Sequence, residues 1–147
     1  MTMPVTTDQV ATLRAYLAGD FDGHKRLFGQ LDRAAAQTGY TALLTAAFFE
    51  AVDRRFAQSG TTAAVVEFVA DVRARHLKEA DELEPRVAER LILAILTDED
   101  IDDLDTQTKI QTQIILLYAL IADERLDDAG LDEFLVEARK LADEWTR

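Results

Sequence analysis

The chain has 147 residues, 48% of them hydrophobic, so it is long enough for one domain with a sizeable core and too apolar for a disordered tail. Its 28 acidic residues against 16 basic ones give a formal net charge of −12. This charge argues against nucleic acid or an anionic membrane surface as the main partner, because both would repel the protein. The chain has no cysteine, which excludes thiol catalysis, cysteine-based zinc sites and disulfide scaffolds.

Apolar residues recur at three- and four-residue spacing along almost the whole chain, and no long stretch alternates as a strand would. This pattern predicts an all-α protein that forms a single helical domain over residues 1–147. We expect a bundle of about seven helices, of which the fifth and sixth are apolar nearly all round and therefore central. The helices are expected at residues 7–18, 20–38, 41–58, 62–76, 85–96, 106–123 and 128–145. Pairs of helices span roughly 43 residues, which leaves a short HEAT-like α-solenoid as the alternative fold.

Local signals mark several of these helix ends. Thr6 with Gln9 three residues later forms a capping-box pattern, Gly19 ends the first helix, and Asp20 can cap the second. Pro85 suits the first position of the fifth helix. On the second helix, we expect one apolar stripe made of His24, Leu27, Phe28, Leu31 and Ala35.

The charge is unevenly placed along the sequence. Residues 1–75 hold eight acidic and eight basic residues, so the whole net charge of −12 lies in residues 76–147. The segment 97–105 has six acidic residues and no basic one, and a second acidic cluster occupies residues 123–128. Both clusters lie at expected connections between helices.

The first cluster resembles a calcium-binding loop only in part. An EF-hand loop starting at Asp98 would need glycine at its sixth position and glutamate at its twelfth, where the chain has Asp103 and Lys109. Acidic residues before a helix also complement the helix dipole. The acidic excess beyond this need predicts a surface that docks a basic partner protein, steered by charge. The candidate partner-binding residues are Asp98, Glu99, Asp100, Asp102, Asp103 and Asp105.

The sequence shows no catalytic constellation. His24 and His76 lie on the apolar stripes of their expected helices, which indicates structural roles, and Ser59 lies in a Gln-Ser-Gly turn. We therefore expect no enzyme activity and no cofactor. An enzyme or small-ligand carrier stays open as an alternative, with a pocket lined by aromatic residues: Tyr16, Tyr40, Phe48, Phe49 and Tyr118.

The stretch from Leu120 to Leu135, a helix, an acidic loop and a further helix, resembles a unit of the tellurite-resistance TerB-like domains, which are small and all-helical. The resemblance covers about 16 residues, and Glu124 stands where the family has a glycine after its aspartate. It implies a divalent-cation-binding stress module as an alternative function. Asp123 and Asp127 are the candidate cation ligands.

The favoured function is a non-enzymatic interaction or regulatory protein with an acidic C-terminal surface. A homodimer through remaining apolar helix surface is a further expectation. Residues 1–8 carry no basic residue and no apolar stretch, and the longest apolar run, 114–122, is too short to cross a bilayer. We therefore expect a cytoplasmic protein without membrane or nucleic-acid partners.

Overall fold

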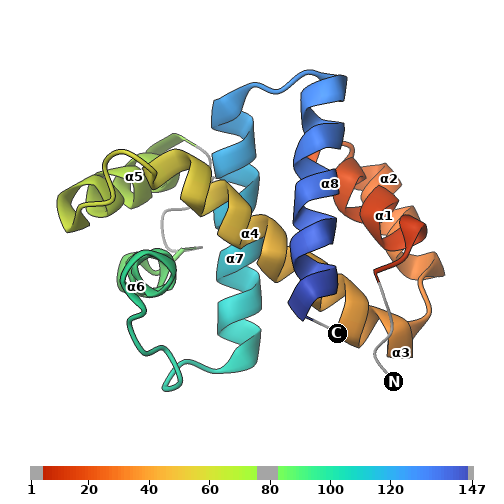
Figure 1. Cartoon of the computed structure of the whole chain (residues 1–147), viewed down its shortest axis with the longest axis horizontal. Helices are drawn as coiled ribbons and strands as arrows, with labels where there is room; N and C mark the ends of the chain where they lie inside the picture. Colours follow the sequence, from red (N-terminus) through yellow and green to blue (C-terminus); the bar gives the residue numbers. More distant parts are fainter. Residues whose placement is uncertain (1–4, 76–82, 146–147) are drawn as a thin grey trace. The chain divides into compact units, whose positions relative to one another are not determined.

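The computed structural model describes residues 5–75 and 83–145, and within these ranges the protein consists of helices and connections, with no strand. Seven longer helices are present, as predicted: α1 (Thr7–Leu17), α2 (Phe21–Gln30), α4 (Thr41–Phe56), α5 (Thr62–Arg75), α6 (Pro85–Thr97), α7 (Thr106–Glu124) and α8 (Asp128–Trp145) (Figure 1). Two short segments, α3 (Arg33–Ala35) and the π-helix η1 (Ala36–Tyr40), lie between α2 and α4. The predicted all-α bundle is confirmed, and the solenoid stays an alternative. His76 lies outside the described residues.

The chain divides into two compact units, one formed by residues 1–50 and 121–147 and the other by residues 51–120. Each unit contains 14 acidic and 8 basic residues, a formal net charge of −6. The neutral part of the sequence, residues 1–75, is therefore divided between the units: residues 1–50 fold with residues 121–147, and residues 51–75 fold with residues 76–120. The uneven charge along the sequence is not a difference between the units. A single domain over residues 1–147 stays a prediction.

In the first unit, α1 packs against both α2 and α8 (Figure 1). The chain just before α1 is fixed to α8 by Val5, which is 1% exposed. The Val5 N–H donates to Asp143 Oδ1 at 3.1 Å, and Arg139 donates to the Val5 carbonyl at 2.7 Å. Large buried side chains fill this unit: Leu13, Leu17, Leu43, Leu44, Phe48, Leu131, Phe134 and Leu135.

The predicted starts of the first two helices and the predicted end of the first are confirmed. The Thr6 hydroxyl accepts from the Gln9 N–H, and the Gln9 side chain accepts from the Thr6 N–H, both at 3.1 Å. Gly19 has a φ of 84°, which favours glycine, and it ends α1. The Asp20 carboxylate accepts from the Gly23 N–H at 3.0 Å and caps α2.

The prediction of one continuous second helix to residue 38 is wrong. α2 ends at Gln30, and a new cap at Asp32 starts α3, which continues through η1 into α4. Gln9 on α1 supports this break, because its Nε2 donates to the Ala35 carbonyl at 3.2 Å. The expected stripe is also wrong, because Phe28 is 50% exposed and both Leu31 and Ala35 lie beyond the end of α2.

In the second unit, α5 packs against α6 (Figure 1). Phe56 at the end of α4 and Phe68 of α5 meet edge to face, with ring centroids 5.7 Å apart. Pro85 occupies the first turn of α6 as predicted, and the Glu84 carboxylate accepts from the Val87 N–H at 2.9 Å. Buried aliphatic side chains complete the packing: Val65, Val69, Val72, Leu83, Leu91, Ile92, Leu116 and Leu117.

No helix within residues 5–75 and 83–145 combines the length and the hydropathy that a membrane crossing requires.

Candidate functional site

The predicted acidic segment, residues 98–105, begins where α6 ends. Asp98 has a left-handed backbone, with φ 58° and ψ 29°, and it terminates the helix. The chain then turns twice: the Asp100 carboxylate accepts from the Asp102 N–H at 2.8 Å, and the Ile101 carbonyl accepts from the Leu104 N–H at 3.0 Å. The segment therefore has defined turns between α6 and α7.

Arg90 on α6 binds this segment from the side. Its two terminal nitrogens donate to the two carboxylate oxygens of Asp103, at 2.8 and 2.6 Å. The same guanidinium donates to the Asp100 carbonyl at 3.0 Å and lies 3.9 Å from a Glu99 carboxylate oxygen. The hydrogen bond from Arg90 is the main reason that the pKa of Asp103 is lowered. A two-pronged arginine–carboxylate bond fixes geometry as well as charge, so Arg90 holds the segment in one shape.

Asp105 starts α7. Its pKa is lowered, chiefly by a hydrogen bond from the Thr108 side chain and also by the Thr108 backbone. This is the geometry of a helix cap, in which an acidic side chain satisfies free N–H groups and complements the dipole. The structural use of acidic residues before a helix is thus confirmed here.

The six predicted partner-binding residues consequently divide into two groups. Glu99, Asp100, Asp103 and Asp105 have their carboxylates in the local contacts described above. Asp98 and Asp102 are exposed and take no part in those carboxylate contacts. The role of Arg90 could not be predicted from the sequence, because Arg90 lies outside the acidic segment and nothing in its local sequence shows which residue it binds.

The second acidic cluster, residues 123–128, is also built into a helix junction. Arg125 has a φ of 52° at the end of α7, and the Asp127 carboxylate accepts from the Gly130 N–H at 2.7 Å to cap α8. Asp128 and Asp132 bind Arg14 of α1, whose Nε lies 2.7 Å from Asp132 Oδ1. Among the described residues, no three histidine or acidic side chains gather closely enough to hold a metal ion. Asp123 and Asp127 therefore gain no support as cation ligands.

His24 has the surroundings of a structural residue. Its Nδ1 lies 3.0 Å from the Thr12 carbonyl oxygen. Its ring lies between those of Tyr16 and Phe28, with centroid distances of 5.3 and 5.9 Å.

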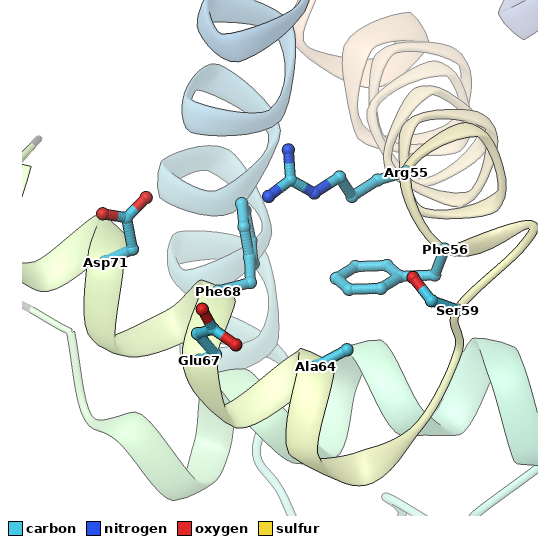
Figure 2. A pocket seen from close by; sticks show the side chains of 7 residues that line it. All are labelled: Arg55, Phe56, Ser59, Ala64, Glu67, Phe68 and Asp71. Atoms are coloured by element: carbon cyan, nitrogen blue, oxygen red, sulfur yellow. The ribbon is translucent and has the colours of Figure 1, made fainter.

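Two surface hollows lie in the second unit. Figure 2 shows the first, of about 430 Å³, where Arg55 and Phe56 of α4 face Glu67, Phe68 and Asp71 of α5. The Arg55 guanidinium lies over the Phe68 ring, 5.2 Å from its centroid. The second hollow, of about 540 Å³, is lined by Glu84, Arg86, Val87, Glu89, Arg90, Leu93 and Glu99.

The aromatic residues predicted to line a ligand pocket line neither of these two hollows. Tyr40 and Phe48 are instead buried, and Phe49, which is 38% exposed, meets the Trp145 ring edge to face. The second hollow runs along α6 and includes Glu99 of the acidic segment together with Arg90, which binds that segment.

No protein-family model matches the chain. No curated protein and no solved structure matches it either. The class that the fold defines is a small all-α protein, and the function has to be argued from the surface.

Proposed function

We propose that the protein is a non-enzymatic interaction or regulatory module that docks a basic partner protein through the acidic segment, residues 98–105. The observation that supports this proposal is the contact between Arg90 and Asp103, which fixes the segment while leaving the Asp103 side chain 63% exposed. A docking surface that is already ordered loses less conformational entropy when a partner binds. Arg90 thus orders the segment for binding while most of the segment's negative charge stays uncompensated.

The electrostatics favour a basic partner. The segment has six acidic residues, and with Arg90 included the local formal charge is −5. Exposed charges of one sign speed the encounter with a partner of opposite sign. At 0.1 M ionic strength, dissolved salt largely screens this attraction at distances beyond about 10 Å. Binding should therefore weaken steeply as salt is added.

The structure indicates which acidic residues to change. Asp98→Asn with Asp102→Asn removes two charges from exposed carboxylates outside the contacts to Arg90 and α7. Changing Asp103 or Asp105 would disturb the shape of the segment as well as its charge. The matched control is Asp53→Asn with Glu133→Gln, which removes two exposed charges elsewhere.

The test is affinity capture from extract of the native cells, with each variant as bait at low and at high salt. We expect the wild type and the control to retain the same basic protein at low salt and to release it at high salt. The Asp98/Asp102 variant should lose it while its melting temperature stays close to that of the wild type. Equal retention by that variant would contradict the proposal.

A cytoplasmic location and a homodimer stay predictions within this proposal. Both concern how the module would act, and neither is needed for the salt-dependent capture.

A further inference from the structure

The first hollow of the second unit is lined by the end of α4, the loop that follows it and α5 (Figure 2). Its volume of about 430 Å³ falls within the range of roughly 300–1,000 Å³ that small-molecule sites occupy. Its floor is firmly packed, because Phe56 and Phe68 meet edge to face and are only 4% and 2% exposed. All its lining residues lie within residues 51–120, so the hollow is complete within one unit.

Arg55 is held over this floor by its contact with an aromatic ring. Its guanidinium carbon lies 5.2 Å from the centroid of the Phe68 ring. Within residues 5–75 and 83–145, Arg55 makes no hydrogen bond or ion pair that would occupy its N–H groups. The N–H donors of a guanidinium lie in its plane and match the two oxygens of a carboxylate. Arg55 is therefore a positioned cation whose donors are available to an anion.

A negative charge lines the same hollow on α5. Glu67 is exposed and makes no ion pair in the part of the chain that the structure describes. Figure 2 shows the Arg55 guanidinium and the Glu67 carboxylate apart from each other, with Phe68 between them. Asp71, one turn further along α5, also lines the hollow, but its carboxylate binds Arg75. The hollow thus presents a cation and an anion that do not neutralise each other.

The charge of the protein narrows the class of ligand. The chain carries a formal charge of −12, and 14 acidic against 8 basic residues in the second unit give that unit −6. A ligand with net negative charge that approaches Arg55 is therefore repelled by the rest of the molecule. A molecule that carries one carboxylate and one ammonium group has no net charge and avoids this repulsion.

We propose that this hollow binds a small amino acid in its zwitterionic form. The ligand carboxylate accepts two hydrogen bonds from Arg55, and the ligand ammonium donates to Glu67. Because these two side chains stand apart with Phe68 between them, a short methylene chain separates the two charges of the ligand, as in γ-aminobutyrate. This inference goes beyond the proposed function, since it uses neither the acidic segment nor Arg90.

The test is an NMR titration of the isotope-labelled full chain with free glycine, β-alanine, γ-aminobutyrate and ε-aminocaproate. Butyrate and butylamine each carry one charged group of γ-aminobutyrate, and inorganic phosphate is an anion of higher charge. We expect at least one zwitterion to bind about tenfold more tightly than butyrate, butylamine or phosphate, because only a zwitterion pairs with both Arg55 and Glu67. The amide signals that move should include those of Ser59 and Phe68, which line the hollow.

Two substitutions assign the two charges. Arg55→Gln should weaken the binding of both the zwitterion and butyrate by about tenfold, because both place their carboxylate on Arg55. Arg55→Lys keeps the positive charge but loses the paired donors, so its affinity for the zwitterion should be intermediate. Glu67→Gln should weaken the zwitterion and strengthen butyrate, because it removes a partner of the ammonium and a charge that repels butyrate.

The opposite responses to Glu67→Gln separate binding from folding, since a folding defect would weaken both probes. The matched controls are Arg54→Gln and Glu133→Gln, which remove the same charges from side chains outside the hollow. Both controls should bind the zwitterion as the wild type does. No binding of any zwitterion, tighter binding of butyrate or phosphate, or full affinity in Arg55→Gln would each overturn the proposal.

Discussion

The Gln9 side-chain amide packs directly against Gly39, because a Cβ on Gly39 would lie 2.5 Å from Gln9 Oε1 and 2.9 Å from Gln9 Nε2. The Gln9 side chain cannot move aside cheaply. The residue is 2% exposed, its Oε1 accepts from the Thr6 N–H, and its Nε2 donates to the Ala35 carbonyl. The absence of a side chain at Gly39 therefore lets Gln9 join the start of α1 to the segment that leads into α4.

Gly39→Ala should consequently lower the free energy of unfolding by about 1–2 kcal/mol, through lost hydrogen bonds of a buried amide. Urea denaturation measures the change. In a Gln9→Ala background, the further loss should be much smaller, since the obstructing amide is gone. Equal losses in the two backgrounds would show that the contact is unimportant.

Gly29→Ala should have the opposite effect. Its Cβ would enter open space within a regular helix. Replacing glycine by alanine in such a position raises helix stability by about 0.5–1 kcal/mol. The same urea measurement should show a gain for Gly29→Ala beside the loss for Gly39→Ala. A loss at both positions would contradict the difference that the structure shows between these two glycines.

Arg90→Gln tests the contact that orders the acidic segment. The hydrogen bond from Arg90 holds the pKa of Asp103 below its ordinary value of 3.8, so this pKa should rise toward that value in the variant. A carboxyl group whose pKa is lowered by folding stabilises the folded state at pH values above its ordinary pKa. This stabilisation is lost as the pH falls through the lowered pKa. Carboxyl NMR titration of Asp103 measures the pKa directly.

Hydrogen exchange gives the second measurement on the same variant. The amides of Asp102 and Leu104 lie in the turns of the acidic segment, and they should exchange faster once Arg90 no longer binds the chain. Arg86→Gln, one turn earlier on α6, removes the same charge and serves as the control. An Asp103 pKa that is equal in the Arg90 and Arg86 variants would contradict the role assigned to Arg90.

Two non-glycine residues, Asp98 and Arg125, end their helices with left-handed backbones. A side chain in this conformation costs about 1–2 kcal/mol, which glycine avoids. Asp98→Gly should stabilise more than Arg125→Gly, because it also removes an anion from the negative end of a helix, whereas Arg125→Gly removes a favourable cation. Thermal unfolding checks the order, and Asp98→Asn isolates the contribution of charge.

Helix starts could be predicted from sequence because capping is local chemistry. Thr6 with Gln9, Asp20 and Pro85 each act within a few residues of their own position, and all are found as expected. The end of α2 could not be predicted, since the Gln9 bond that supports it crosses 26 residues to Ala35. Arg90 was missed for the same reason, because Asp103 lies 13 residues away and the pairing depends on how the chain turns at Asp98.

The last prediction concerns Tyr40. Burial raises the pKa of this phenol well above its ordinary value of 10.0, and the neighbouring Tyr16 raises it further to a smaller extent. Since the folded pKa is the higher one, the unfolded chain releases the proton first as the pH rises. The stability is complete below the ordinary pKa, and it is lost as the pH rises toward the folded value.

Ultraviolet titration of tyrosinate should accordingly show one step at unusually high pH, and Tyr40→Phe should abolish that step. Above pH 10.0, the free energy of unfolding of the wild type should fall faster with pH than that of Tyr40→Phe. Tyr16→Phe removes only the smaller of the two causes that raise the pKa of Tyr40, so the titration step at high pH should remain. Survival of the late step in Tyr40→Phe would assign it to another phenol and refute the effect of burial at position 40.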